Sequence, residues 1–207
     1  MRVVRKAEDI ADAYAQASAE ARGAFGDPRL YLEKLIEGGR HVEIQVMGDR
    51  TGKVLHFGER ECSIQRRHQK LIEESPSPVL SHSLREEMGA AAVKAAEAVR
   101  YLGAGTVEFL FKDGEYFFLE MNTRLQVEHP VTELVYGVDL VELQLRVAAG
   151  ETLEIDQAGL SPEGHAIECR ITSEDPFRGF LPSTGRVDYL RIPGGPGVRW
   201  DGGIMNG

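Results

Sequence analysis

Polar and apolar side chains alternate strictly over residues 41–47, which read HVEIQVM. Because successive side chains of a β-strand point to opposite faces, this alternation predicts a strand with one core face and one polar face. Turn-forming residues follow at 49–52, and the apolar run 54–57 then predicts an antiparallel partner strand. The polar side of this hairpin, which includes His41, is therefore available for function.

Elsewhere the pattern predicts further helices and strands. Apolar side chains spaced three and four residues apart indicate helices over residues 7–25, 81–102 and 139–149. Runs rich in β-branched and aromatic residues indicate strands over 30–36, 106–111, 116–121, 165–171 and 185–192. The charged stretch 59–70 has little apolar periodicity and predicts a loop. Because strands and helices do not alternate regularly, we expect an α+β fold with mainly antiparallel sheets.

Composition and charge exclude several classes of protein. The 207 residues are 42% hydrophobic and carry a formal net charge of −9, which argues for a folded protein without general affinity for nucleic acid or anionic membranes. No apolar run approaches the roughly 18 residues of a membrane span, and the first residues lack a secretory signal, so we expect a cytoplasmic protein. Cys62 and Cys169 form no C-x-x-C motif and are expected to be buried, reduced thiols.

Two glutamates in the hairpin 106–121 and the asparagine that directly follows it form a candidate metal site. Glu108 lies inside an apolar strand, and Glu120 and Asn122 share one face of its partner. A buried carboxylate needs a partner, and Mg²⁺ prefers oxygen ligands of this kind. A two-residue turn at 113–114 would put Glu108 on the opposite face from Glu120, so the metal hypothesis predicts a three-residue turn with a bulge. The alternative is that Glu108 faces solvent.

The segment 122–130 offers a candidate anion pocket. The residue before Pro130 is biased toward extended backbone, so we expect Arg124, Gln126 and Glu128 to alternate onto one side. Arg124 suits a carboxylate-like anion, Gln126 adds an amide, and Glu128 can accept a proton. A surface loop without function is the alternative.

A basic segment, the densest positive patch of this acidic chain, contains Gln65, His68 and Lys70. Such a patch suits phosphate groups, and Lys70 is the residue that we single out. Most basic runs are nevertheless solvated surfaces, which is the alternative here.

Five segments, in order and at consistent spacing, together resemble biotin carboxylase, the ATP-grasp component of biotin-dependent carboxylases such as acetyl-CoA carboxylase. They are YLEKLI (31–36), HVEIQ (41–45), ECSIQRRHQK (61–70), EMNTRLQVEHP (120–130) and ECRI (168–171). The resemblance implies an enzyme that forms carboxyphosphate from ATP and bicarbonate and then carboxylates biotin on a separate carrier. It also implies a biotin carboxyl carrier and a carboxyltransferase as partners, and a homodimer in the complete enzyme.

The resemblance also implies roles for individual residues. For the nucleotide, it implies an adenine-binding hinge at Glu33, Lys34 and Ile36, and a ribose and phosphate side lined by His41, Gln65 and His68. For the charged groups, it implies Lys70 beside bicarbonate or phosphate, and Mg²⁺ or Mn²⁺ held by Glu108 and Glu120 with Asn122 beside them. For the chemistry, it implies Glu128 as the general base held by Arg124, Gln126 and the Val127 N–H, and Arg170 at the ureido oxygen of biotin.

The chain also departs from the family's pattern. It begins just after the place of a glycine-rich loop that covers the ATP phosphates, and it stops partway through the family's C-terminal domain. We therefore expect a central fragment, with a partial ATP-grasp domain over 1–150 and the beginning of the C-terminal domain over 151–207, divided by the turn-rich residues 151–164. Alone, such a fragment is expected to be inactive.

Two questions stay open at the level of sequence. An ATP-grasp ligase of the carbamoyl phosphate synthetase type would share the glutamate pair and Asn122, whereas residues 124–130 and Arg170 favour the biotin enzyme. The final acceptor, whether acetyl-CoA, propionyl-CoA or pyruvate, is set in another component.

Overall fold

The computed structural model describes residues 2–205, so the outermost residues of the two expected domains, Met1 and 206–207, lie outside the described residues. The chain forms two compact units, which divide after Glu168. The elements up to this division are η1 (Ala7–Asp9), α1 (Ile10–Phe25), β1 (Arg40–Gly48), β2 (Val54–Arg66), β3 (Gln69–Ser75), α2 (His82–Ala98), β4 (Gly103–Lys112), β5 (Glu115–Asn122), α3 (His129–Tyr136), α4 (Leu140–Ala149), η2 (Gln157–Gly159) and β6 (Ala166–Cys169). The expected boundary between 1–150 and 151–207 stays a prediction.

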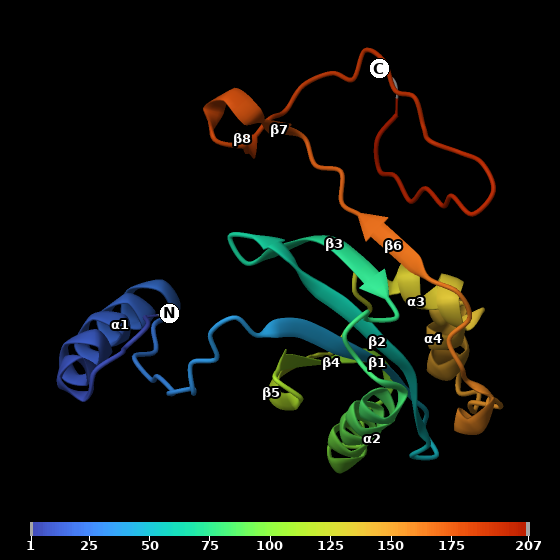
Figure 1. The fold of residues 1–207 in the computed structure, drawn as a ribbon, viewed down its shortest axis with the longest axis horizontal. Helices are drawn as coiled ribbons and strands as arrows, with labels where there is room; N and C mark the ends of the chain where they lie inside the picture. The colour runs from blue at the N-terminus through green and yellow to red at the C-terminus, as the bar shows by residue number, and fades with distance from the viewer. Residues whose placement is uncertain (1, 206–207) are drawn as a thin grey trace. The chain divides into compact units, whose positions relative to one another are not determined.

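A six-stranded sheet in the order β5-β4-β1-β2-β3-β6 forms the centre of the larger unit (Figure 1). The pairs β1–β2, β1–β4, β2–β3 and β4–β5 are all antiparallel. The expected α+β class with mainly antiparallel sheet is confirmed. The hairpin predicted from the alternation at 41–47 is also confirmed, with β1 and β2 as its strands.

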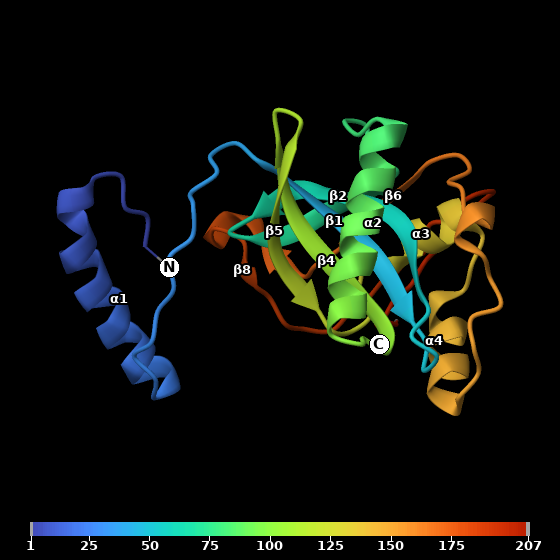
Figure 2. The same cartoon turned by 90° about the horizontal axis from the view of Figure 1, so that it is seen from below.

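The two faces of this sheet pack against different helices. Figure 2 shows α2 lying across one face, where Val42, Ile44 and Val46 of β1 form one hydrophobic cluster with α2 residues such as Met88. On the opposite face, Met47 of β1 belongs to a second cluster, to which α4 contributes. The alternation of β1 therefore has the predicted effect, because its apolar side chains at 42, 44 and 46 all pack on the face that α2 covers.

The helices follow their sequence signals closely. The N-cap of α2 is Ser81, whose side chain accepts a hydrogen bond from the backbone N–H of Leu84, and α4 ends at Gly150, which has a left-handed backbone. The α2 helix stops at Ala98, earlier than the expected residue 102. The α3 helix, from His129 to Tyr136, was not expected.

Two expectations about strands before α2 are wrong. Residues 30–36 form no strand, because no strand among the described residues pairs with them. Large apolar side chains such as Tyr31 and Leu32 lie exposed there. The expected loop 59–70 is instead regular, because β2 runs on to Arg66 and turns directly into β3. Glu59, Arg60 and Glu61 form ion pairs with residues of α2 and β1, so a search for apolar periodicity could not detect the strand.

The smaller unit, from Cys169 onward, holds β7 (Glu174–Asp175), η3 (Pro176–Arg178) and β8 (Leu181–Pro182). The two short strands pair antiparallel. The expected strand 165–171 shrinks to β6, and the strand expected over 185–192 does not form. Of the two cysteines, Cys62 is buried as expected, but Cys169 is exposed.

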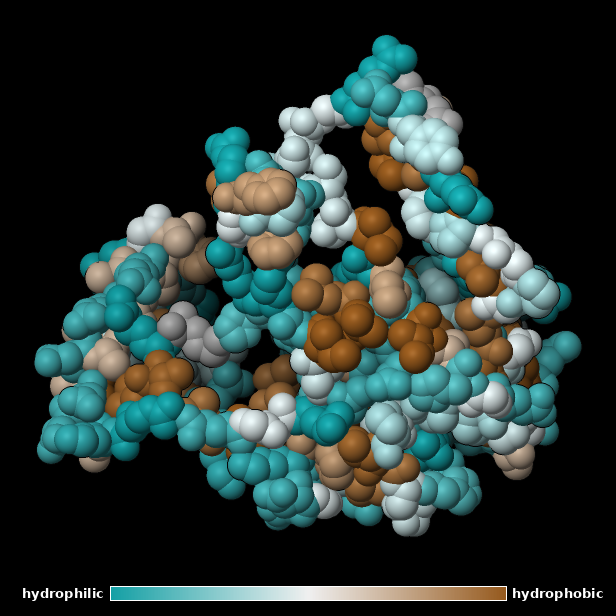
Figure 3. All heavy atoms as spheres, turned by 45° about the horizontal axis from the view of Figure 1, so that its top comes forward, coloured by the Kyte–Doolittle hydropathy of each residue, from teal (hydrophilic) through white to brown (hydrophobic). Residues whose placement is uncertain are grey.

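Exposed apolar side chains are scattered over the described residues. Figure 3 shows hydrophobic residues, in brown, as several separate groups among hydrophilic ones on the face drawn. Phe25 on α1 is 84% exposed, and α1 buries no residue, so the core of the larger unit lies in its sheet and not in the N-terminal helix. Between residues 2 and 205, the structure holds no helix with the length and apolar character that crossing a membrane requires.

Candidate active site

The hairpin of β4 and β5 brings Glu108 and Glu120 to the same face of the sheet by a route that the sequence did not suggest. The connection is a two-residue turn, in which Asp113 and Gly114 both have positive φ, and the expected three-residue turn is wrong. The register then shifts between Glu108 and Phe109, so that Leu119 is an extra residue in β5. Glu108 therefore lies directly opposite Glu120, because the bulge that the metal hypothesis requires lies within the strand.

Glu108 is 4% exposed, which rules out the alternative that it faces solvent. Its Oε1 accepts hydrogen bonds from Asn122 Nδ2 at 2.9 Å and from Gln126 Nε2 at 2.9 Å. Burial disfavours the charged carboxylate, but His41 and Lys70 outweigh it and hold the pKa of Glu108 below its usual value. Glu108 is therefore a buried anion at the centre of a polar network.

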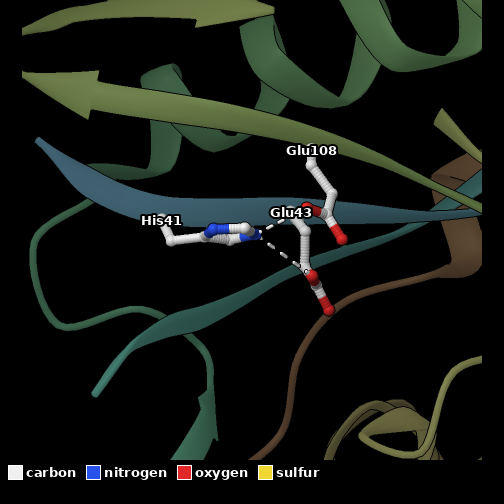
Figure 4. Close-up of side chains that lie close together, drawn as sticks. All are labelled: His41, Glu43 and Glu108. Carbon is white, nitrogen blue, oxygen red and sulfur yellow. Dashed lines mark ion pairs between the residues drawn. The ribbon is translucent and has the colours of Figure 1, made fainter. Parts of the chain in front are cut away.

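His41 contacts this anion from β1. Its Nε2 lies 2.8 Å from Glu108 Oε2 and 3.7 Å from Glu43 Oε2, and Figure 4 shows the imidazole directed toward both carboxylates. Burial favours the neutral ring, yet the two glutamates overcome it and raise the pKa of His41 to about 9. At neutral pH the structure therefore holds a cationic imidazole between two buried carboxylates.

Lys70 is the second cation of the network. It lies at the start of β3, just after the turn formed by Arg67 and His68. Its Nζ donates to three carboxylates, those of Glu43, Glu108 at 3.1 Å and Glu128 at 2.6 Å. Burial lowers the pKa of a lysine, but these carboxylates outweigh burial and keep the pKa of Lys70 above its ordinary value. The basic segment therefore supplies a buried, charged lysine to the site and is not a solvated surface at this residue.

Glu128 reaches the network from a segment whose shape was not anticipated. The expected extended run up to Pro130 is wrong, because Glu128 has φ −78° and ψ 10° and is the N-cap of α3. Its side chain is 2% exposed, as is expected for a group that is turned toward Lys70. Gln126 is also buried, whereas Arg124 is exposed and contacts Asn122 Oδ1 at 3.4 Å. The surface-loop alternative is therefore excluded for Gln126 and Glu128.

Arg60 is the functional candidate that the sequence analysis missed. It lies on β2 with no exposed surface, and its Nε donates to Glu43 Oε1 at 2.6 Å. Glu43 is equally buried, and Arg60, His41 and Lys70 overcome the burial and hold its pKa well below the usual range. The sequence offers an indication only for its partner Glu43, because the alternation of residues 41–47 places Glu43 on the polar face of β1. Nothing in the charged run 59–70 distinguished Arg60 from its neighbours.

Several predicted residues lie outside this network. Lys34, in the irregular segment before β1, lies with its Nζ 5.0 Å from the centre of the Phe117 ring, in cation–π contact. The other outlying residues of the larger unit are Glu33 and His68, which are exposed, Ile36, which is partly buried beside Gly39, Gln65, which donates to the Cys62 carbonyl, and Val127, which is exposed. Arg170 belongs to the smaller unit. Their predicted roles stay predictions.

The arrangement has a definite chemical capacity. Three buried carboxylates, those of Glu43, Glu108 and Glu128, surround Lys70. Two groups of side chains here lie close enough together to share a metal ion, namely His41 with Glu43 and Glu108, and Glu43 with Cys62 and Glu128; neither group includes Glu120. Opposed carboxylates such as Glu108 and Glu120 repel each other unless a cation lies between or beside them. Oxygen donors of this kind suit a hard cation at the β4–β5 side, and the positive charge of Lys70 favours an anion beside Glu128. The metal site stays a prediction.

Comparison with known proteins identifies the family. The family model for the carbamoyl-phosphate synthase L chain, ATP binding domain matches residues 1–156, and the model for the biotin carboxylase C-terminal domain matches residues 168–207. The biotin carboxylase of a Nostoc species is 54% identical over 202 residues, which are 97% of this chain and 45% of the relative. The chain thus spans less than half the length of this relative.

Two solved structures share the fold. A biotin carboxylase–β-γ-ATP complex from Campylobacter jejuni matches with a TM-score of 0.90 and 51% identity, over 96% of this chain and 44% of that one. The biotin carboxylase domain dimer of the Hydrogenobacter thermophilus 2-oxoglutarate carboxylase, in complex with MgADP, ADP and bicarbonate, matches with a TM-score of 0.87 and 50% identity, over 94% and 43% of the two chains. The expected ATP-grasp fold is confirmed, and the chain belongs to the biotin carboxylase family.

Proposed function

We propose that the complete enzyme uses ATP and bicarbonate to carboxylate biotin on a carrier. By complete enzyme we mean a full-length biotin carboxylase that carries residues 1–207 of this chain at the corresponding positions. The observation that carries the proposal is the contact of Lys70 with Glu128 at 2.6 Å and with Glu108 at 3.1 Å, which joins the candidate base to the candidate metal side. The biotin carboxylase relatives support this activity over that of a carbamoyl phosphate synthetase.

The metal side fits Mg²⁺ or Mn²⁺. Glu108 and Glu120 oppose each other across two strands, and Asn122, whose side chain contacts Glu108, adds an amide oxygen nearby. These are the hard oxygen donors that such ions prefer. A bound ion would neutralise charge on the nucleotide phosphates, and these three residues would hold it. The MgADP in the Hydrogenobacter thermophilus structure supports this assignment.

The nucleotide would lie beside the segment that precedes β1, the first residues of β1 and the turn between β2 and β3. We propose that Glu33, Lys34 and Ile36 contact adenine and that His41, Gln65 and His68 line the ribose and phosphates. The support is the motif YLEKLI at 31–36 together with the position of His41 beside Glu108. Lys70, cationic and partly buried, would add charge stabilisation for bicarbonate or for the transferred phosphoryl group.

The base side would act on bicarbonate. Arg124, with its planar fork of donors, and Gln126 would hold the anion together with the backbone N–H of Val127. A carboxylate oxygen of Glu128 would then accept the bicarbonate proton, so that the deprotonated oxygen attacks the γ-phosphorus of ATP; the bond from this phosphorus to the β–γ bridging oxygen breaks, and carboxyphosphate and ADP result. When biotin N1′ takes the carboxyl group, carboxyphosphate loses its phosphate and N1′ loses its proton, and Arg170 would stabilise the negative charge that then develops on the ureido oxygen.

The partners follow from this reaction. The biotin would arrive on a biotin carboxyl carrier protein or domain and would pass its carboxyl group to a carboxyltransferase. We also propose a homodimer for the complete enzyme, supported by the dimeric relative, and a cytoplasmic location without nucleic-acid or membrane partners. The division into a domain of residues 1–150 and a second of residues 151–207 belongs to the same proposal.

The decisive assay is ATP hydrolysis that depends on both bicarbonate and free biotin. We expect turnover by the complete enzyme, and none by the isolated 207-residue chain. A complete enzyme that hydrolyses no ATP under these conditions would contradict the proposed reaction. Clear turnover by the isolated chain would contradict only the expectation that the chain alone is inactive.

A further inference from the structure

Arg60 is the most fully engaged side chain of the site. It is 0% exposed, and each of its five N–H groups has an acceptor. The acceptors are Glu43 Oε1 at 2.6 Å, Gln45 Oε1 at 2.7 Å, Thr132 Oγ1 at 3.0 Å, Thr106 Oγ1 at 3.2 Å and Gln126 Oε1 at 3.0 Å. One planar guanidinium thus joins β1, β4, α3 and the segment before α3.

We propose that Arg60 is a positioning residue for the bicarbonate pocket, in that it fixes Gln126, Lys70 and Glu128 without touching the substrate itself. This inference rests on the proposed function. Three independent lines of contact carry it, one through each of the residues that it fixes.

The first line runs through Gln126. Arg60 Nη2 donates to the carboxamide oxygen of Gln126, and the carboxamide nitrogen donates to Glu108 Oε1 at 2.9 Å. Because a carboxamide has one oxygen and one NH₂ group, these two bonds set its orientation. Without Arg60, the amide of Gln126 would be free to rotate, and its oxygen, buried at this position, would lose its partner.

The second line runs through Glu43 and Lys70. Arg60 binds one carboxylate oxygen of Glu43, and Lys70 binds the other. Since Arg60 shares the neutralisation of this buried anion, Lys70 is able to contact Glu128 at the same time. With Arg60 removed, Glu43 would attract Lys70 more strongly and draw its ammonium away from Glu128.

The third line runs through α3. Arg60 Nη1 donates to Thr132, which is fully buried and lies four residues after Glu128, the N-cap of the helix. Residues four apart lie on the same face of a helix, so this bond anchors the face from which Glu128 projects. Arg60 therefore fixes both the helix that carries the candidate base and the lysine that contacts it.

The test is the Arg60→Lys variant of the complete enzyme, assayed by bicarbonate-dependent ATP hydrolysis. Lysine keeps the charge but donates from a single nitrogen, so it cannot bind acceptors on both sides of the guanidinium. We expect the KM for bicarbonate to rise roughly 10-fold and kcat to fall by up to about 10²-fold, the scale of a misplaced site. The KM for ATP should stay within about twofold, because none of the five bonds of Arg60 goes to a residue that we assign to the adenine, the ribose or the phosphates.

The matched control is Arg85→Lys. Arg85 lies on α2 at the other face of the sheet, and its Nε donates at 2.6 Å to Glu59, a fully buried neighbour of Arg60 on β2. The same substitution there also replaces a guanidinium that is bonded to a buried glutamate by an ammonium, so it should lower stability and leave the KM for bicarbonate unchanged. A rise in this KM that is equal in both variants would overturn the inference, because the effect would then be general destabilisation.

Thr132→Val keeps the proposal testable if Arg60→Lys does not fold. Valine has nearly the same shape as threonine and removes only the acceptor on α3, so a smaller rise in the bicarbonate KM, of about threefold, is expected. If the wild-type enzyme is active and the KM for bicarbonate is unchanged in Thr132→Val, and in Arg60→Lys where that variant folds, the inference about Arg60 is overturned and the proposed function is not. A wild-type enzyme without bicarbonate-dependent hydrolysis would overturn the proposed function and this inference with it.

Discussion

Strands β1 and β4 bury apolar side chains on one face of the central sheet and charged side chains on the other. On β1, Val42 and Ile44 point to the α2 side and are completely buried among apolar side chains. The intervening Glu43 is just as completely buried, but on the other face and among charged partners. The strand β4 repeats this division with Val107 on one face and Glu108 on the other. Burial alone therefore does not tell a residue of the core from a residue of the site.

The difference lies in what each face does for stability. Burial of an apolar side chain on the α2 face stabilises the fold by about 1.5–3 kcal/mol. A buried ion pair contributes far less net free energy, because desolvation of its charges offsets most of their attraction. Substitutions of apolar residues on the α2 face should therefore change stability first, and substitutions of charged residues in the site should change activity first.

The largest expected effect is on the α2 face. We expect Ile44→Ala to reduce the free energy of unfolding by about 4 kcal/mol, because it removes buried methyl groups and leaves a cavity that the sheet cannot close. Denaturant unfolding of the complete enzyme measures this, and the activity of the remaining folded enzyme should be near normal. The control is Val141→Ala at a partly exposed position of α4. A loss of turnover without a loss of stability would contradict the division between the faces.

On the site face we expect the reverse result for Glu128→Gln. The amide keeps the shape of the side chain but cannot accept the bicarbonate proton, so biotin carboxylation should fall by roughly 10²-fold, equivalent to about 2.7 kcal/mol. Carboxylation assays measure this, and thermal unfolding should show little loss of stability. Glu142→Gln, at an exposed position on α4, is the matched control and should be near normal. Near-normal turnover of Glu128→Gln would argue against its role as the base.

The contrast between the faces also explains which features the sequence could predict. Alternation identified β1, because its apolar residues recur with period two on the α2 face. Runs of β-branched and aromatic residues around a turn identified the β4–β5 hairpin. Alternation failed for residues 59–66 of β2, where Glu59 and Arg60 are both fully buried and each has a partner from another element. Such a strand has no apolar period, because charge pairing replaces hydrophobic contact on both of its faces. The pairing depends on tertiary structure, which no local pattern encodes.

The candidate site shows the same limit. The sequence singled out Glu108, Lys70 and Glu128 by residue type and motif, and the structure brings all three together. The sequence did not predict how they meet, because the bulge at Leu119 and the start of α3 depend on register and packing with other strands. Arg60 escaped notice for a related reason, since its five acceptors come from positions between 43 and 132 that only the fold assembles.

A third prediction uses pH to compare the faces, with His41→Gln measured without nucleotide or metal. The pKa of His41 is raised to about 9 from an ordinary 6.5, so its contribution to stability is fully present below about pH 6.5 and is lost as the pH rises through 9. The difference in free energy of unfolding between wild type and His41→Gln should therefore shrink by on the order of 2 kcal/mol between these pH values. Denaturant unfolding at a series of pH values measures it. A difference that stays constant across this range would exclude a charged His41.

The smallest expected effect is at the exposed edge of the site face. Glu120 opposes the buried Glu108 but is itself exposed, so Glu120→Gln should weaken the metal site without disturbing the network around Lys70. We expect the Mg²⁺ concentration for half-maximal ATP hydrolysis to rise about tenfold, or about 1.4 kcal/mol, with stability unchanged. Glu115→Gln, at the exposed start of the same strand, controls for a general loss of negative charge on β5. If both variants shift the Mg²⁺ requirement equally, Glu120 acts through the overall field and not as a ligand, and the polar face would then hold its metal through Glu108 without this partner.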